Sequence, residues 1–354
     1  MVGKKEVEAS LSSPVSDAVK ASFSSKDHPL LMVKSLSKSY RKKLVLRDVN
    51  FEVASRDIFG VIGMSGSGKT TMFQLMSGMM KPESGDVLVK SSLIFPLNGK
   101  KHPDYISVFR NVSNIKRHFG FASQMPSFYE HLTVEENILM YGALYGMKKK
   151  KVKENMSRLL HLVDLSSEKD TVAAELSGGM QRRLDIACAL IHDPKVLFLD
   201  EPTSDLDPVM RKQIWALIKE INTKGTTIVL ASHILEEVEN LCTKVAILHD
   251  RRVLGYGTLK ELKRLFKRDR QVKVELEKGN YDELIAKLKK VKELERVVKK
   301  DNMLVVFVPM DDAVIRKVIR AVESCKDRLV SLDIADATLN EIFEALTKKE
   351  GIKG

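Results

Sequence analysis

Cysteine is scarce in this chain, and its placement argues against two kinds of structure. The three cysteines, Cys188, Cys242 and Cys325, are odd in number and lie far apart among 354 residues. Their spacing matches no zinc motif and offers no disulfide framework of the kind found in small secreted proteins. We therefore expect three inert, mostly buried thiols.

Long apolar segments are also missing. No run approaches the roughly 20 apolar residues that a helix needs to cross a bilayer. The first residues contain no apolar stretch like that of a secretory signal, so none is expected. The chain is therefore not expected to form a pore by itself. With 44% apolar and 30% charged residues, the composition is typical of a globular cytosolic protein.

The charge is unbalanced. A formal net charge of +12 indicates an acidic partner, such as nucleotide, nucleic acid or an anionic membrane surface. Local basic runs occur at Lys148–Lys151 and from Lys263 to Lys273, and such runs are usually solvated surface. No nucleic acid is expected as a partner, and a weak attraction to the inner face of a membrane is favoured over it.

The length predicts one large domain and a smaller one. Residues 1–29 are rich in serine and poor in aromatics, which is typical of a mobile extension. Residues 30–265 alternate short apolar runs with helical periods, which predicts a largely parallel α/β domain. Within it, residues 91–116 fit neither period and are interpreted as a surface insertion. Residues 125–190 are predicted to form a helical subdomain.

Two segments give local detail. Thr133 and Glu136 fit a capping box that opens a helix over residues 134–145. Residues 268–354 are predicted to form a small α+β accessory domain with a β-α-β-β-α-β order, the ferredoxin-like arrangement. Its expected elements are a strand at 271–276, a helix at 281–291, a hairpin of 294–299 and 304–309, a helix at 311–325, a strand at 329–334 and a last helix at 338–346.

Three apolar runs predict strands that are buried on both faces: Ile58–Ile62, Val196–Leu199 and Thr226–Ala231. Each is followed at once by polar residues that carry chemistry. Because ligands of open α/β sheets gather at the carboxyl ends of the strands, three such endings predict one shared site.

The first ending matches the phosphate-binding loop G-x-x-x-x-G-K-[ST]. Its glycines let backbone amides turn around a polyphosphate, Lys69 adds a positive charge at the β- and γ-phosphates, and the Thr70 hydroxyl can ligate Mg²⁺. The following helix aims its positive end at the same anion. A chance glycine-rich turn is the alternative, which the buried strand before it disfavours. The residues assigned to nucleotide are Gly63, Ser65, Gly66, Ser67, Gly68, Lys69, Thr70 and Thr71.

The second ending is a pair of adjacent carboxylates, Asp200 and Glu201. Adjacent residues at the end of a strand point in different directions. Asp200 can therefore support a metal while Glu201 faces an attacking water. Ordinary solvated acids are the alternative, and the phosphate-binding loop disfavours it.

Over most of residues 30–262 the chain resembles the ATPase subunits of ABC transporters. The signature LSGGQ of that family stands here as Leu176-Ser-Gly-Gly-Met-Gln181, followed by Arg182 and Arg183. It is a serine-capped helix start with a bare backbone, which makes a second anion site. In the family, two subunits pair head to tail, and each signature closes on the ATP held by the other subunit. The resemblance thus assigns Ser177, Gly178 and Gly179 to nucleotide across a homodimer, or across a pair with a similar subunit.

Further positions follow in the order of the family. Tyr40 resembles the aromatic that stacks on adenine, with a plain surface tyrosine as the alternative. Gln124 resembles the glutamine that senses Mg²⁺ and links the site to an integral membrane permease. Residues 204–207 resemble the loop that crosses between subunits, which adds Asp207 to the nucleotide contacts. Asp205 departs from the usual glycine or alanine. His233 resembles the switch histidine at the γ-phosphate.

The reaction implied by the resemblance is ATP hydrolysis by in-line attack of water on the γ-phosphorus. Its catalytic residues are Glu201, which activates the water, together with His233 and Lys69. Mg²⁺ is expected on Thr70, Gln124 and Asp200.

The ending at residues 337–347 is similar to those of drug- and lipid-type exporter ATPases, so we expect an exporter subunit that is cytoplasmic and peripheral on the inner face of the cell membrane. The alternative is a cytosolic ABC ATPase without a transport role, which acts on a ribosome, nucleic acid or a protein assembly.

Overall fold

The computed structural model divides into two compact units, with the division between Thr258 and Leu259, and each is described by itself. Residues 1–28 of the predicted extension, residues 94–103 of the predicted insertion and the predicted last helix lie outside the described residues. The structure describes residues 29–335 except for residues 42, 94–103, 111, 266–269, 280, 292, 295, 301–302, 310 and 326.

A six-stranded sheet forms the centre of the first unit, in the order β10-β9-β3-β8-β7-β6. The strands from β6 to β9 in this sheet are parallel, and only β10 pairs antiparallel. The three predicted buried strands are present as β3, β7 and β8, and all their residues are buried. The strands are β3 Ile58–Ile62, β6 Phe119–Ala122, β7 Val196–Asp200, β8 Thr227–Ser232, β9 Lys244–His249 and β10 Arg252–Thr258.

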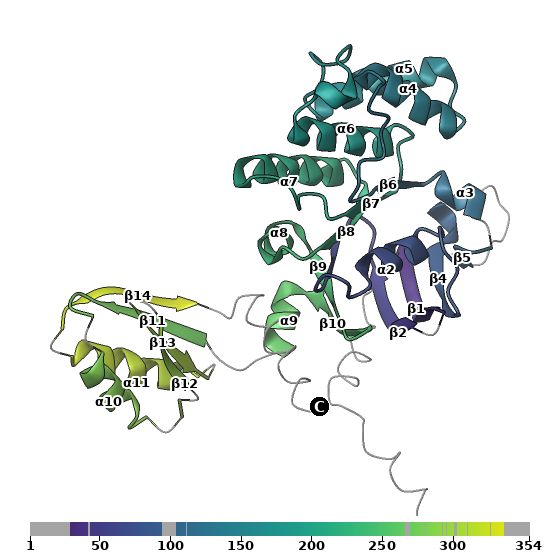
Figure 1. The fold of residues 1–354 in the computed structure, drawn as a ribbon. Coiled ribbons are helices and arrows are strands. Elements are labelled where there is room, and N and C mark those ends of the chain that lie inside the picture. Colours follow the sequence, from purple (N-terminus) through teal and green to yellow (C-terminus); the bar gives the residue numbers. More distant parts are fainter. Residues whose placement is uncertain are drawn as a thin grey trace, which may run out of the picture. The chain divides into compact units, whose positions relative to one another are not determined.

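A second, antiparallel sheet, ordered β2-β1-β4-β5, lies beside the first (Figure 1). The prediction of a largely parallel domain missed it. Apolar and polar residues do not alternate cleanly along its two longest strands, because Ser35 and Asp48 adopt left-handed backbone angles and the β1–β2 register shifts there. The strands are β1 Leu31–Tyr40, β2 Lys43–Val53, β4 Ser84–Lys90 and β5 Tyr105–Ser107.

The two sheets share one apolar core. Helix α2 (Lys69–Met76) contributes buried side chains to it. Phe51 of β2 stacks on Phe59 of β3 with ring centroids 5.1 Å apart, and Phe73 of α2 meets Phe198 of β7 edge-on at 5.7 Å. The start of α2, where the phosphate-binding loop ends, is therefore fixed against both sheets.

The prediction of a surface insertion at residues 91–116 is wrong for the part that the structure describes, because this part contributes to the core. Residues 91–93 form the short helix η1, β5 pairs with β4, and Val112–Lys116 form α3. Val108 and Ile115 are fully buried in the shared core. These elements are too short to show a period, so the pattern at residues 104–116 looked irregular although the segment is built in.

Most helices in the described part of the first unit lie between residues 134 and 241. Helices α4, α5 and α6 pack on one another, as Figure 1 shows. The capping box is confirmed, since the Glu136 amide donates to Thr133 Oγ1 at 3.2 Å and the Thr133 amide donates to Glu136 Oε2 at 2.9 Å. The helices are α4 Val134–Leu144, α5 Lys149–Leu162, η2 Ala173–Glu175, α6 Gly178–Leu190, α7 Pro208–Thr223 and α8 Leu235–Leu241.

The second unit begins with α9 (Leu259–Leu265) and contains one antiparallel sheet in the order β12-β13-β11-β14. This is the strand order of a split β-α-β fold, and its strands and helices follow one another as expected. Apolar faces of α10 and α11 pack on the sheet. The elements are β11 Arg270–Leu276, α10 Asp282–Leu288, β12 Arg296–Lys300, β13 Met303–Val308, α11 Asp312–Glu323 and β14 Leu329–Ala335. In the described parts of both units, no helix is long and apolar enough to span a bilayer.

Candidate nucleotide site

Three loops meet at one edge of the six-stranded sheet. Strands β3, β8 and β7 are parallel neighbours, so their carboxyl ends lie side by side. The loop after β3 carries Lys69, the turn after β7 carries Glu201, and the turn after β8 carries His233. This convergence is the shared site that the three polar strand endings predicted.

The phosphate-binding loop has the backbone that its glycines allow. Gly68 precedes α2 with φ of 106°, a conformation that side chains rarely adopt. At Gly63, an added Cβ would lie 2.5 Å from Ser67 Oγ and 2.6 Å from Leu248 O. The loop therefore turns tightly against β9 and presents its amides at the start of a helix, where an anion is stabilised.

Lys69 and Glu201 form a nearly buried ion pair. Lys69 Nζ lies 3.1 Å from Glu201 Oε1, with 6% and 10% of the two side chains exposed. The ammonium also donates to the carbonyl oxygens of Gly63 and Met64, at 2.9 and 3.2 Å. His233 Nδ1 contacts the other carboxylate oxygen of Glu201, while the His233 ring stays half exposed. The three residues predicted to be catalytic are thus in mutual contact through Glu201.

Glu201 reaches this place through an unusual backbone conformation. Its φ is 51°, in the left-handed region, and its amide donates to the carbonyl of Ala231 at 2.9 Å. Such a conformation costs about 1–3 kcal/mol for a residue other than glycine and is held by its surroundings. The turn carries Glu201 to Lys69 while Asp200 stays buried at the end of β7.

Asp200 fits the expected magnesium site. It is 2% exposed, and its Oδ1 has no hydrogen-bond partner in the described structure. Burial raises the pKa of Asp200, and a hydrogen bond from Thr70 opposes that shift. A buried carboxylate oxygen without a partner, next to a threonine hydroxyl, suits a hard cation that takes its other ligands from phosphates and water. Ser67 Oγ is a second buried polar atom that lacks a partner. No cluster of three or more His, Cys, Asp or Glu side chains among the described residues could hold a metal.

A cavity of about 170 Å³ connects further predicted residues. Gln124, Gly178, Glu201 and Asp205 all contribute to its wall. Gln124 follows β6 and is exposed. This cavity therefore lies where the loop after β6, the start of α6 and the turn after β7 meet, and Glu201 forms part of its wall.

The signature opens α6 as expected. Ser177 Oγ accepts from the amide of Met180 at 3.4 Å, and both Ser177 and Gly178 are exposed. Gly179 is buried, and an added Cβ would lie 3.1 Å from the sulfur of Met210. No hydrogen bond of Ser177 reaches the phosphate-binding loop of the same chain in the described structure.

Two other predicted nucleotide ligands have structural contacts. Asp207 caps α7, accepting from the amides of Val209 and Met210 at 2.8 and 3.0 Å. Tyr40, at the end of β1, is 43% exposed, and its hydroxyl donates to the sulfur of Met80 at 3.2 Å. Asp207 therefore has a capping role of its own, and the partly exposed Tyr40 ring has Lys38 Nζ over one face, 5.9 Å from its centroid.

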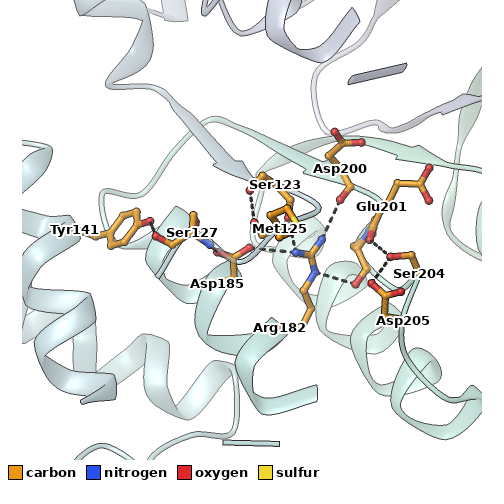
Figure 2. A network of polar contacts seen from close by, with 11 residues as sticks. Ser123, Met125, Ser127, Tyr141, Arg182, Asp185, Asp200, Glu201, Ser204 and Asp205 are labelled. Atoms are coloured by element: carbon orange, nitrogen blue, oxygen red, sulfur yellow. Dashed lines mark hydrogen bonds and ion pairs between the residues drawn. The ribbon is translucent and has the colours of Figure 1, made fainter. Parts of the chain in front are cut away.

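Sequence reasoning missed a network beneath the site, centred on Arg182 (Figure 2). Arg182 donates to the main-chain oxygens of Ser123, Asp200 and Pro202 and pairs with Asp185. The only available signal was the i, i+3 spacing of Arg182 and Asp185 on one helix face. The carbonyl partners of Arg182 are main-chain groups, so no side-chain pattern in the sequence marks them.

Comparisons with known proteins agree with this geometry. Residues 46–204 match the family model described as ABC transporter. The chain is 36% identical over 223 residues to a Nod factor export ATP-binding protein of Rhizobium sp. (strain N33), covering 63% of this chain and 69% of that protein. It is 31% identical over 233 residues to a linearmycin resistance ATP-binding protein of Bacillus subtilis (strain 168), covering 66% of this chain and 70% of that protein.

A solved structure is also similar. The ATP-binding subunit of an ABC transporter superposes with a TM-score of 0.57 at 31% identity, covering 67% of this chain and 93% of that one. The first unit supplies the phosphate-binding loop, the carboxylate pair and the signature that this fold carries. The chain belongs to the family of ABC transporter ATP-binding proteins, ATPases that hydrolyse ATP to power transport.

Proposed function

We propose that this chain is the ATPase subunit of an exporter, bound to the inner face of the cell membrane through a separate integral membrane permease. The observation that carries the proposal is the contact of Glu201 with both Lys69 and His233 beside the buried Asp200. Export is supported by relatives named for Nod factor export and for linearmycin resistance. The relatives' names give no support to a cytosolic role on ribosomes or nucleic acid.

In the proposed reaction, water attacks the γ-phosphorus of ATP in line with the leaving β-phosphate oxygen. Glu201 accepts the proton of that water, and Lys69 moves its contact from Glu201 to the phosphate oxygens, where negative charge accumulates. His233 holds the carboxylate of Glu201 from the solvent side. Asp200, Thr70 and Gln124 would hold Mg²⁺, which would supply positive charge to offset the negative charge of the phosphates.

The active form is proposed to be a two-fold pair, either a homodimer or a pair with a similar subunit. Ser177 and Gly178 present an exposed helix start, and no atom lies within 4 Å of a Cβ added at Gly178. A bare, positively polarised helix end of this kind suits the γ-phosphate of an ATP bound to the other copy. In a two-fold arrangement, Ser177 of each copy would serve Lys69 and Glu201 of the other.

Mixing two inactive variants tests this arrangement. Glu201→Gln should keep ATP binding and lower turnover about 100-fold or more, because positioned general bases contribute roughly 10²–10⁴-fold. Ser177→Arg should block the signature. In a mixed pair, one site carries both defects and the other carries neither. With free exchange, half the pairs are mixed, so activity should return to about a quarter of the wild-type value.

The matched control mixes Glu201→Gln with Lys69→Ala. Both changes affect the same half of a site, so each site in a mixed pair keeps one defect and activity should stay absent. If the Ser177→Arg mixture also stays inactive while light scattering shows that pairs form, the proposed head-to-tail pairing is wrong. Near-normal turnover of Glu201→Gln alone would remove that residue from the reaction.

A further inference from the structure

Arg182 joins the signature helix to the two loops that carry Gln124 and Glu201. It lies in α6, five residues after Ser177, with 10% of its side chain exposed. Its guanidinium donates to the carbonyl of Ser123 at 2.6 Å, to that of Asp200 at 3.0 Å and to that of Pro202 at 2.9 Å. Ser123 directly precedes Gln124, and Asp200 and Pro202 stand on either side of Glu201.

These contacts depend on the shape of the side chain. A guanidinium carries five N–H donors in a rigid plane, so one arginine can hold carbonyls in three directions. A lysine at the same position has a single nitrogen on a flexible stem. It retains the charge but cannot span Ser123, Asp200 and Pro202 together.

The guanidinium is itself held in place. Asp185, one turn further along α6 and 1% exposed, pairs with Arg182 at 3.2 Å. Asp185 Oδ1 accepts from the amide of Ser127 at 3.0 Å and from its hydroxyl at 2.5 Å. The carbonyl of Ser127 accepts from Tyr141 of α4 at 2.6 Å. Figure 2 shows this chain of contacts leading from α4 to the turn at Glu201.

The turn at Glu201 needs such support. Its left-handed φ of 51° is costly, and the bond from the Glu201 amide to Ala231 holds its backbone from the side of β8. Arg182 holds the carbonyls of the residues before and after Glu201. A shift of α6 would therefore move the carboxylate of Glu201 relative to Lys69.

We propose that Arg182 is the positioning residue through which the signature helix sets the geometry of Glu201 and Gln124. The proposal rests on the proposed function in one respect, that Glu201 activates the water. In the proposed pair, Ser177 contacts the nucleotide of one site while Glu201 acts in the other. Arg182 would then transmit the closure of one site to the catalytic residue of the other.

Arg182→Lys tests the proposal in the full-length chain. Its turnover number should fall about 10- to 100-fold, because misplacement of catalytic groups by about 1 Å costs rates of that order. Binding of a fluorescent ATP analogue should change less than about threefold, since Lys69 and the phosphate-binding loop are untouched. The matched control is Arg183→Lys, which should leave turnover unchanged, because its guanidinium pairs with the exposed Asp164 and donates to Gln213 instead of to the two site loops.

If Arg182 and Asp185 had only a structural role, the variants would show a different pattern of turnover and nucleotide binding. Loss of stability alone would lower the folded fraction and all activities together, which melting curves followed by Trp215 fluorescence would report. If Arg182→Lys does not fold, the double variant Arg182→Gln with Asp185→Asn leaves no unpaired buried charge and still lacks the three carbonyl contacts. It should show the same loss of turnover.

The outcomes separate the two proposals. Wild-type turnover in folded Arg182→Lys, or in the double variant, overturns the role of Arg182 and leaves the proposed function standing. Wild-type turnover in Glu201→Gln overturns both. Arg182→Lys can also be compared in the wild type and in a Gln124→Ala background. A loss of turnover by the same factor in both argues against the proposed role of Arg182, because the effects of the two substitutions should overlap when Arg182 acts partly through Gln124.

Discussion

Acid should unfold this protein partly through one histidine, His192, which lies two residues after the end of α6 at Leu190. The ring stacks on Tyr145, with centroids 3.5 Å apart and an interplanar angle of 13°. Its Nε2 donates to the carbonyl of Phe119 at 3.0 Å, while Nδ1 is buried without a hydrogen-bond partner in the described structure. The ring is therefore neutral, and a proton on Nδ1 would be buried without an acceptor.

Burial lowers the pKa of His192 to about 4 from its ordinary value of 6.5, and the bond to Phe119 opposes the shift only in part. The unfolded chain binds a proton near pH 6.5, but the folded chain does not until about pH 4. Between these values the unfolded state holds more protons, so the free energy of unfolding falls as the pH falls. The full difference is about 3 kcal/mol, of which about 2 kcal/mol should be lost between pH 7 and pH 5.

Urea unfolding followed by the fluorescence of Trp215, the single tryptophan, measures this loss at the two pH values. Other groups also titrate in this range, so the informative quantity is the difference between the wild type and His192→Gln. The glutamine amide can still donate to Phe119 but cannot take up a proton, and the variant should lose about 2 kcal/mol less. His131→Gln, at an exposed histidine, is the matched control. Equal losses in the wild type and His192→Gln would refute the argument.

Two further predictions concern the nucleotide and the helical subdomain. Lys69→Ala removes the charge expected at the β- and γ-phosphates and should weaken binding of a fluorescent ATP analogue about tenfold or more, as titration would show; unchanged affinity would place the phosphates elsewhere. Thr133→Ala breaks the capping box of α4 and should lower the free energy of unfolding by about 1 kcal/mol in urea without changing nucleotide affinity, and a neutral result would mean that the cap is not formed in solution.

The parts of the site that the sequence predicted are those encoded by neighbours in the chain. The phosphate-binding loop, the carboxylate pair after β7 and the capping box at Thr133 each need only a few consecutive residues. Fully apolar strands located the sheet edge where the loops meet, and the parallel order then brings Lys69, Glu201 and His233 together. Local pattern and simple topology suffice for these features.

Other features were hidden because they depend on tertiary contacts or on irregular backbone. The antiparallel sheet was missed because the left-handed residues Ser35 and Asp48 interrupt the alternation of β1 and β2. Arg182 was missed because its partners are carbonyl oxygens, which every residue possesses. No side-chain pattern marks the carbonyls of Ser123 and Asp200, which lie 59 and 18 positions away.

The left-handed turn at Glu201 combines a carboxylate pair that the sequence predicted with an irregular backbone that it did not predict. Along a regular strand, Asp200 and Glu201 would point to opposite faces of the sheet, so one of them would leave the edge where Lys69 lies. The turn directs Glu201 back to that edge while Asp200 stays buried at the end of β7. Glycine would adopt this backbone at lower cost but has no carboxylate to offer. The strain therefore falls on the residue that the chemistry requires, and the contacts of Arg182 on both sides of it give the fold a means of holding that residue in place.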